Sequence, residues 1–384
     1  LEKYYEYFEK FIDMGKAYVC TCDPEAYKKL IGQGKACDCR ELEISEQKDR
    51  WKKMFKEYKQ GEAVGRLKTD LKDKNPAMRD FPLVRINEAN HARQKKKYRV
   101  WPLMNLAVTV DDIESGMTHV IRAKDHVDNA KRQEIMYKYL GKKFPEALFV
   151  GKINFEGMPL SSTKTGEGIK EGKYSGWDDI RLPFLPALRR RGFTPEALTK
   201  YALEVGLSLV DKTVSKDEFF KAIEHFNKEV IDSEADRFFF VANPKKLKVS
   251  GANDASVEIE KYPGKPERGF RKFKTNGEFY VSGLDEVKKG NNYRLMHLFN
   301  FKDGKFVSDE VDDSLKARAL HWLPLNGKNV KVKVLIPDGK WVAGLAEEGV
   351  SKLKVGQIVQ FERFGFVRLD KKGKDELEFW FAHK

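Results

Sequence analysis

Long apolar runs are missing from this sequence of 384 residues, and no stretch approaches the roughly twenty consecutive apolar residues that a membrane-spanning helix needs. The first residues, LEKYYEYFEKF, also lack the basic start, apolar segment and cleavage site of a signal peptide. Neither a low-complexity tract nor a clear internal repeat is present. The absence of apolar runs excludes membrane insertion, no signal peptide is visible, and we expect a soluble, cytoplasmic protein. Its length predicts several domains.

Cysteine is scarce, and its 4 copies form two C-x-C pairs, Cys20 with Cys22 and Cys37 with Cys39. Four thiolates can bind one tetrahedral Zn²⁺, although C-x-x-C is the more common spacing. The alternative is four reduced thiols, because disulfides are not expected in the cytoplasm. We expect a zinc site, and we expect it to be structural because four cysteines leave no open coordination position.

Acidic residues are outnumbered, since 59 Asp and Glu stand against 73 Lys and Arg, for a formal net charge of +14. Such an excess favours a polyanionic partner, because each phosphate contact releases condensed counterions. A lysine-rich proteome that keeps its protein surfaces charged explains the same composition equally well. Nucleic acid is therefore the leading partner class on charge, without being established by it.

Helical periodicity, strand alternation and Gly or Pro turn signals change along the chain and divide it into five segments. A strand–helix–strand order in the third segment predicts parallel pairing and one half of a Rossmann-like fold. The last segment has the length of two small β-barrels. The predicted segments are 1–16 (a helix ended by Gly15), 17–95 (an α+β insert with the cysteines), 96–169 (α/β, with strands at 106–110, 118–122 and 147–153 and a helix at 129–140), 170–241 (helices) and 242–384 (short strands).

One loop of the third segment, GMPLSSTKTGEG at residues 157–168, combines small and hydroxyl residues with a single lysine, Lys164. Such a loop can close over phosphates, and its lysine can neutralise charge on a phosphoryl group. A loop of this composition on its own is more often a solvated turn. Its sequence context therefore decides between the two interpretations.

The loop is followed by YSGWDDIRLP at residues 174–183 and by LRRRGFTP at residues 188–195. This order resembles the glutamyl/glutaminyl branch of the class I aminoacyl-tRNA synthetases, in which a KMSKS-type loop precedes a GWDDPR segment and an LRRRG-x-x-P junction. Ile180 replaces the usual Pro, and the loop resembles the archaeal S-S-x-K variant. The tail, with HWLP at 321–324 and VQFERFGFVR at 359–368, resembles the β-barrel region of archaeal glutamyl and of glutaminyl enzymes.

The resemblance implies an enzyme that uses ATP and Mg²⁺ to form glutamyl-adenylate and then charges tRNA(Glu), with tRNA(Gln) as a further substrate left open. Lys164 would be the catalytic lysine of an ATP-binding loop that Ser161, Ser162 and Thr163 shape. The insert would meet the acceptor end of tRNA, and the two barrels would bind the anticodon arm. We expect a monomer and no membrane partner.

A second string, THVIRAKDH at residues 118–126, resembles the amino-acid and adenosine pocket of the family. Arg122 would bind the substrate carboxylate, because a guanidinium is always charged and pairs in a bidentate way. Asp125 and His126 would lie at the carboxyl edge of the sheet. Met104 stands where many relatives have a substrate-contacting Tyr, and Val108 replaces a polar residue, so both belong to the predicted pocket. His119, in an apolar strand, is expected in the core.

Two alternatives accompany this interpretation. A glutaminyl enzyme shares the fold and the barrels, although the C-x-C pairs and the loop variant argue against it. The HIGH signature of the family does not occur in the sequence, so we expect an N-terminally incomplete synthetase, and the alternative is a catalytically silent tRNA-binding protein. Phe361, Phe364 and Phe366 are expected to fill a barrel rather than to stack on bases.

Overall fold

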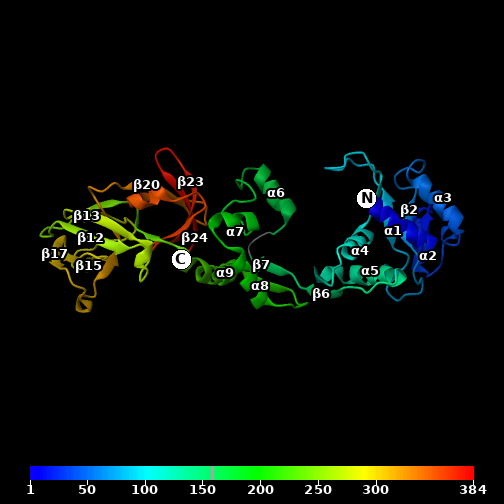
Figure 1. Cartoon of the computed structure of the whole chain (residues 1–384), viewed down its shortest axis with the longest axis horizontal. Helices are drawn as coiled ribbons and strands as arrows, with labels where there is room; N and C mark the ends of the chain where they lie inside the picture. The colour runs from blue at the N-terminus through cyan, green and yellow to red at the C-terminus, as the bar shows by residue number, and fades with distance from the viewer. Residues whose placement is uncertain (157–159) are drawn as a thin grey trace. The chain divides into compact units, whose positions relative to one another are not determined.

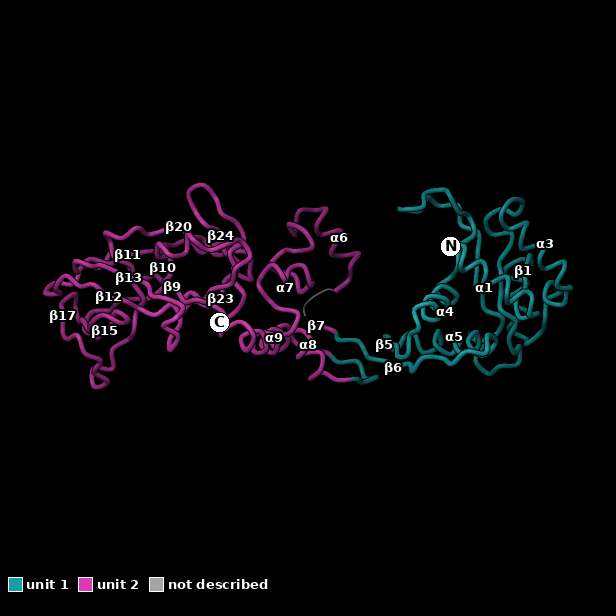
Figure 2. Tube along the Cα trace, viewed as in Figure 1, with its two compact units in different colours: residues 1–153, 207–212 teal, residues 154–206, 213–384 magenta. Residues whose placement is uncertain are grey.

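The computed structural model describes residues 1–156 and 160–384. The chain divides into two compact units, residues 1–153 with 207–212 and residues 154–206 with 213–384, which Figure 2 shows in two colours. Within the described part of the chain, no helix is both long and apolar enough to cross a membrane. The first three residues of the predicted lysine loop, 157–159, lie outside the described residues.

The first unit contains a four-stranded antiparallel sheet in the order β1-β2-β3-β4, of which Figure 1 labels β2. Phe8, Phe11 and Ile12 of the first helix are fully buried in the core beside this sheet. Gly65 on β2 permits the contact, because a Cβ there would lie 2.4 Å from the Phe8 ring. The elements are α1 (Glu2–Asp13), β1 (Ala17–Cys20), α2 (Pro24–Gly32), α3 (Ile44–Met54), β2 (Val64–Leu67), β3 (Pro82–Ile86) and β4 (Val100–Pro102), with short 3-10 turns at Asp38–Arg40 and Pro76–Met78.

The first unit continues with α4 (Met104–Glu114), β5 (His119–Ala123), a 3-10 turn (Lys124–His126), α5 (Val127–Tyr139) and β6 (Glu146–Val150). Strands β5 and β6 are parallel, as the strand–helix–strand order predicts. The predicted strand at 106–110 is wrong, because these residues lie in α4. Its buried residues Asn105, Leu106, Thr109 and Val110 follow a helical period, which a five-residue apolar run does not reveal.

The second unit begins with β7 (Ile153–Glu156) and with helices whose ends agree with the sequence signals. Gly192 ends a helix with φ of +104°, Thr194 caps the next, and Ser215 and Glu218 form a reciprocal capping box. The remaining elements of this region are α6 (Ser162–Lys170), α7 (Leu185–Arg191), α8 (Pro195–Val205), β8 (Lys212–Ser215), α9 (Lys216–Ile231) and a 3-10 turn (Asp232–Glu234).

The rest of the second unit is built from short strands, as predicted. A seven-stranded sheet has the order β10-β21-β20-β24-β23-β22-β9. Its two edge strands, β9 (Arg237–Phe238) and β10 (Phe240–Ala242), are separated by one residue, so the sheet curls around its own core. The other strands of this sheet are β20 (Val330–Leu335), β21 (Trp341–Ala346), β22 (Ile358–Phe361), β23 (Gly365–Lys372) and β24 (Leu377–His383), with a 3-10 turn at Glu348–Lys352.

Three smaller sheets enclose a second β-rich core, which contains Phe279, Phe301 and Trp322. Phe361 is fully buried in the core of the curled sheet and Phe364 packs on it, so the prediction that these two rings fill the interior is confirmed. Phe366 is also fully buried, but in a separate cluster with Ile231 and Ala235. The strands of the smaller sheets are β11 (Lys245–Lys248), β12 (Ala255–Glu260), β13 (Phe270–Thr275), β14 (Glu278–Val281), β15 (Asn292–Leu295), β16 (Asn300–Lys302), β17 (Lys305–Ser308), β18 (Arg318–Leu320) and β19 (Trp322–Pro324), with 3-10 turns at Pro266–Arg268 and Asp313–Leu315.

Candidate functional site

Arg122, the predicted carboxylate-binding residue, projects from β5 into a small polar cluster. Its Nη2 donates to Asp112 Oδ2 on α4 at 2.9 Å, and its Nη1 donates to Gln133 Oε1 on α5. Gln133 in turn donates to Asn105 Oδ1 at 3.5 Å. Burial raises the pKa of Asp112, with the charge of Arg122 opposing the shift. Two helices therefore fix the guanidinium, which keeps further N–H groups for a ligand.

Met104 and Val108 lie one turn apart on α4 and therefore on the same face of that helix. Met104 is exposed, with 45% of its surface accessible, and Val108 is half-buried. Asn105 and Asp112, which belong to the polar cluster of Arg122, also lie on α4. One helix thus presents two of the predicted pocket residues and two groups that hold Arg122.

Asp125 and His126 lie in the turn that follows β5, at its carboxyl end as predicted. Asp125 pairs with Lys152 at 2.7 Å, and the hydrogen bond and charge of Lys152 hold the pKa of the carboxyl below its ordinary value. His126 Nδ1 accepts a hydrogen bond from Asn129 at 3.1 Å. The expectation that His119 is a core residue is wrong: it is exposed at the first position of β5, and its Nε2 lies 3.4 Å from Glu146.

Lys164 and the hydroxyl residues before it form the first turn of α6 rather than an irregular loop. Ser161 is the N-cap, and its Oγ accepts a hydrogen bond from the Lys164 N–H at 3.4 Å. Ser162, Thr163 and Lys164 are exposed. A helix start is favourable for anions because its N–H groups are unpaired. Lys164 belongs to the second unit and Arg122 to the first.

The two strings after the loop, at residues 174–183 and 188–195, have structural partners within the second unit. Asp179 accepts hydrogen bonds from Ser175 and Arg181; burial raises its pKa, but these hydrogen bonds outweigh burial and hold the pKa below its ordinary value. Arg190 pairs with Asp370 on β23 at 2.7 Å, and Arg191 donates to the Ala382 carbonyl on β24 at 2.7 Å. The arginines therefore fasten α7 to the curled sheet.

The four cysteines come together at the end of β1 and at the turn after α2, as the spacing predicts. All four Sγ atoms lie within 4.8 Å of one another, and the cysteines are free thiols. The Cys20–Cys37 and Cys22–Cys39 sulfur distances are 4.0 and 3.6 Å. Zn–S bonds of about 2.3 Å in a tetrahedron require sulfur separations of roughly 3.8 Å, so the arrangement fits one Zn²⁺.

Contacts from α3 hold the two C-x-C turns together. Gln47, which is buried, accepts from the Val19 N–H at 2.8 Å and donates to the Cys39 carbonyl at 2.6 Å. Arg50 Nη1 donates to Cys39 Sγ at 3.3 Å. The hydrogen bond from the Cys20 thiol lowers the pKa of Cys37 to about 5. The same hydrogen bond raises the pKa of Cys20, and burial raises the pKa of Cys22. The pKa of Cys39 is lowered like that of Cys37, so the surroundings favour thiolates, the form that binds metal, at two of the four cysteines.

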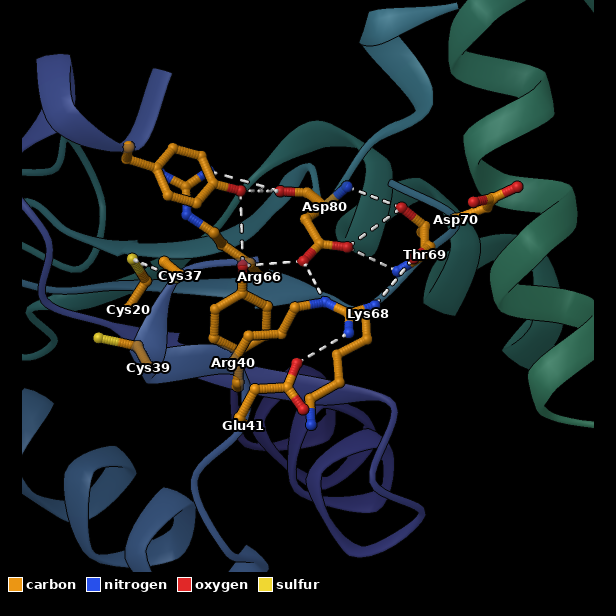
Figure 3. A network of polar contacts seen from close by, with 12 residues as sticks. Cys20, Cys37, Cys39, Arg40, Glu41, Arg66, Lys68, Thr69, Asp70 and Asp80 are labelled. Carbon is orange, nitrogen blue, oxygen red and sulfur yellow. Dashed lines mark hydrogen bonds and ion pairs between the residues drawn. The ribbon is translucent and has the colours of Figure 1, made fainter. Parts of the chain in front are cut away.

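A second polar network supports the insert beside the cysteines, and Figure 3 shows Asp80 at its centre between Arg40 and Thr69. The Asp80 carboxylate accepts from Tyr18 Oη at 2.9 Å, from Arg40 Nε at 2.8 Å and from the Thr69 N–H at 2.7 Å. Asp80 is fully buried and has a φ of +33°. Tyr18 precedes Cys20 by two residues, so the network fixes the strand that carries the first cysteine pair.

Sequence reasoning missed Asp80, Gln47 and the partners of Arg122. Gln47 and Gln133 carry a weak signal, because each is a polar residue on the buried face of an amphipathic helix. Asp80 carries a further signal, since Asp is enriched among residues with positive φ. Their partners are far away in the sequence, and one-dimensional patterns do not identify them.

Three family descriptions match this chain along most of its length. A family described as "tRNA synthetases class I (E and Q), catalytic domain" matches residues 1–233, and two described as anti-codon binding domains match residues 235–321 and 316–370. A solved glutamate tRNA ligase from Elizabethkingia meningosepticum covers 61% of this chain at 16% identity, with a TM-score of 0.38.

Among curated relatives, "Glutamate--tRNA ligase" of Methanocaldococcus jannaschii is 44% identical over 100% of this chain and 70% of its own length. The protein of the same name from Pyrococcus furiosus is 45% identical over 100% of this chain and 69% of its own length. Because the catalytic-domain family matches residues 1–233 and these relatives align along the entire chain, the chain belongs to the class I tRNA synthetases of the E and Q type.

Proposed function

We propose that this chain functions in a glutamyl-tRNA synthetase, the enzyme that uses ATP to activate glutamate and then transfers the glutamyl group to tRNA(Glu). The observation that carries the proposal is the alignment of all of this chain, at 44% and 45% identity, with 70% and 69% of the length of relatives that bear the name glutamate–tRNA ligase. In the first step an α-carboxylate oxygen attacks the α-phosphorus of ATP and pyrophosphate leaves. In the second step a terminal ribose hydroxyl of tRNA attacks the activated carbonyl and AMP leaves.

Arg122 is assigned to the side-chain carboxylate of glutamate. The α-carboxylate must stay free to attack phosphorus, whereas the side-chain carboxylate can remain paired throughout the reaction. Asp112 and Gln133 fix the guanidinium through their hydrogen bonds. A carboxylate accepts charge-assisted hydrogen bonds from the guanidinium through both of its oxygens, whereas the amide of glutamine offers one oxygen and an NH2 group that cannot accept, so Arg122 also favours glutamate over glutamine. Met104 and Val108 would line the pocket, and Asp125 and His126 would lie near its rim.

Lys164 is assigned to the charge that develops on the phosphates. ATP enters as its Mg²⁺ complex, and the ion neutralises part of the phosphate charge. Lys164 is exposed in the first turn of α6, where unpaired backbone N–H groups also favour an anion. Ser161, Ser162 and Thr163 shape this turn. The second Rossmann-like half, with parallel β5 and β6, and two anticodon-binding β-barrels complete the proposed architecture.

A structural Zn²⁺ bound by Cys20, Cys22, Cys37 and Cys39 is part of the proposal. When bound, the ion joins the end of β1 to the turn at Asp38–Arg40 and so orders the insert. The insert is assigned to the acceptor end of tRNA. Charging of tRNA(Gln) in addition to tRNA(Glu) and a monomeric state in the cytoplasm remain predictions from the sequence.

Pyrophosphate exchange in the presence of tRNA tests the function. We expect glutamate, and not glutamine, to drive exchange, and we expect Lys164→Ala to lower the rate by about 100-fold or more, because it removes a cation aimed at developing charge. Lys170→Ala, which changes an exposed lysine at the other end of the same helix, is the matched control and should leave the rate unchanged. Exchange driven by glutamine, or an unaffected Lys164→Ala variant, would overturn the assignment.

A further inference from the structure

The segment between β3 and β4, residues 87–99, is strongly basic, and we call it the basic hairpin. Its 13 residues contain five Lys and Arg and one Glu, which is a net +4 of the +14 carried by all 384 residues. Glu88 pairs with Arg99 at 2.6 Å, at the base of the hairpin. Arg93, Lys95, Lys96 and Lys97 are exposed, and no ion pair to a described carboxylate involves them.

Backbone and side-chain hydrogen bonds order the tip. His91 and Lys95 exchange two backbone hydrogen bonds, of 3.1 and 2.8 Å, around a three-residue turn. The imidazole Nδ1 of His91 accepts from the N–H groups of Arg93 and Gln94, both at 3.1 Å. Lys95 has the left-handed φ of +50° that such a turn needs at its end. The cations are therefore presented by a defined backbone and not by a disordered loop.

Aromatic contacts fasten the hairpin to the sheet. The His91 ring stacks on Trp101 of β4, with ring centroids 4.8 Å apart and planes inclined by 14°. Tyr98 packs edge-on against the same indole at 6.4 Å, and its hydroxyl donates to Glu2. In Figure 1 the segment is the thin loop that extends from the first unit near its N-terminus. Ordering at both base and tip reduces the conformational entropy that binding costs.

We propose that the basic hairpin binds the phosphate backbone of tRNA, through Arg93, Lys95, Lys96 and Lys97. The inference rests on the proposed synthetase function, which supplies a polyanionic partner. Three of the four cations are lysines, which are point charges and lack the fork-shaped guanidinium that pairs with base edges. We therefore expect the hairpin to contact phosphates, and this contact does not depend on the base sequence of the tRNA. An acidic protein is the alternative partner for the basic hairpin. Its carboxylates are irregularly spaced, whereas the phosphates of a nucleic acid repeat along the backbone.

The test is the salt dependence of tRNA binding by the full chain. We expect the variant with Lys95→Ala, Lys96→Ala and Lys97→Ala to bind tRNA on the order of 10- to 100-fold more weakly at ~0.1 M salt, because each phosphate contact contributes about 0.7 to 0.9 to the slope of log K against log[salt]. The slope should fall by about 2. The variant with arginine at the same three positions keeps the charge and should keep the slope of the wild-type protein.

The matched control carries Lys52→Ala, Lys56→Ala and Lys59→Ala, three exposed lysines in and after α3. It loses the same net charge, so an equal loss of slope in this control would overturn the proposal. An unchanged slope in the hairpin variant, or weaker binding of an acidic protein with tRNA binding intact, would also overturn it. Glutamate-dependent pyrophosphate exchange at saturating tRNA is measured in parallel. Absence of this exchange in the wild-type protein refutes the proposed function, whereas the salt slope of tRNA binding tests the hairpin alone.

Discussion

Asp80 illustrates how much one buried residue determines in the insert. Its carboxylate is shared by a tyrosine, an arginine and a backbone N–H, and its own N–H donates to Thr69 Oγ1 at 2.7 Å. Arg40, which pairs with it, directly follows Cys39 in the chain. A single carboxylate therefore connects β1, the second cysteine turn and the segment between β2 and β3.

We predict that Asp80→Asn lowers the free energy of unfolding by about 3 kcal/mol, because the amide leaves the Arg40 charge uncompensated and turns a donor toward other donors. Urea denaturation measures the change. Asp70→Asn is the control: Asp70 is exposed and its carboxylate accepts from the Lys72 N–H, so it should alter stability by less than about 0.5 kcal/mol. Equal effects of the two variants would contradict the role given to Asp80.

The residues that sequence patterns identify best are those that act through local chemistry. The cysteine cluster was predictable because C-x-C spacing limits what four thiols can do, and the structure brings the four sulfurs together. Arg122 was predictable as a candidate from its string. Its partners Asp112 and Gln133 were not, because they reach it from two helices whose packing is decided by the whole core.

At the scale of elements, helix ends depend on local signals, and the parallel pair β5 and β6 follows from the order of the elements. Caps at Gly192, Thr194 and Ser215 depend on one or two neighbouring residues, so they can be read from sequence. The helix α4 was missed, because the five-residue run at 106–110 contains apolar and β-branched residues and too few turns to display a period. Contacts between sheets were also beyond prediction.

One such contact is the buried Arg271 on β13, which pairs with two glutamates that border strands of the curled sheet. Its Nη1 donates to Glu347 Oε1 at 3.1 Å and its Nη2 donates to Glu362 Oε1 at 2.6 Å. Glu347 Oε1 also accepts from the Phe239 N–H at 2.6 Å. Burial raises the pKa of Glu347 to about 7, while the charge of Arg271 opposes the shift.

Arg271→Met should therefore destabilise the protein in a pH-dependent way. The folded-state pKa of Glu347 lies above its ordinary value of 4.5, so protonation of Glu347 stabilises the fold. This contribution to the free energy of unfolding is complete below pH 4.5 and is lost as the pH rises through about 7. Without Arg271 the pKa rises further. We expect a loss of about 3 kcal/mol near roughly pH 8 and a smaller loss near roughly pH 5.5, measured by urea denaturation.

Lys272→Met is the matched control for this variant, because Lys272 is the next residue on β13 and pairs with Glu258 in an exposed position. It removes the same charge and should change stability by less than about 0.5 kcal/mol at either pH. A loss in Arg271→Met that does not depend on pH would show that Glu347 stays ionised, and would refute the pKa argument.

At the scale of the whole molecule, the two units obtain their stability in different ways. The first unit has a core of aromatic and aliphatic residues from α1, α3 and the four-stranded sheet, and next to it a small cluster around the cysteines. The β-rich part of the second unit has two large cores of its own. A metal at the cysteines should therefore stabilise one part of the chain only.

Hydrogen exchange followed by mass spectrometry separates these parts, because it reports protection segment by segment. We expect the protein to bind one Zn²⁺ per chain, and we expect removal of the ion by a chelator to speed exchange in residues 17–71 while residues 330–383 keep their protection. The variant with Cys22→Ser and Cys39→Ser should reproduce the chelated pattern without chelator, since it leaves two thiolates. Protection that is lost equally in both segments would mean that the ion stabilises the whole chain, and protein that purifies without metal and is fully protected would mean that the four thiols need no ion.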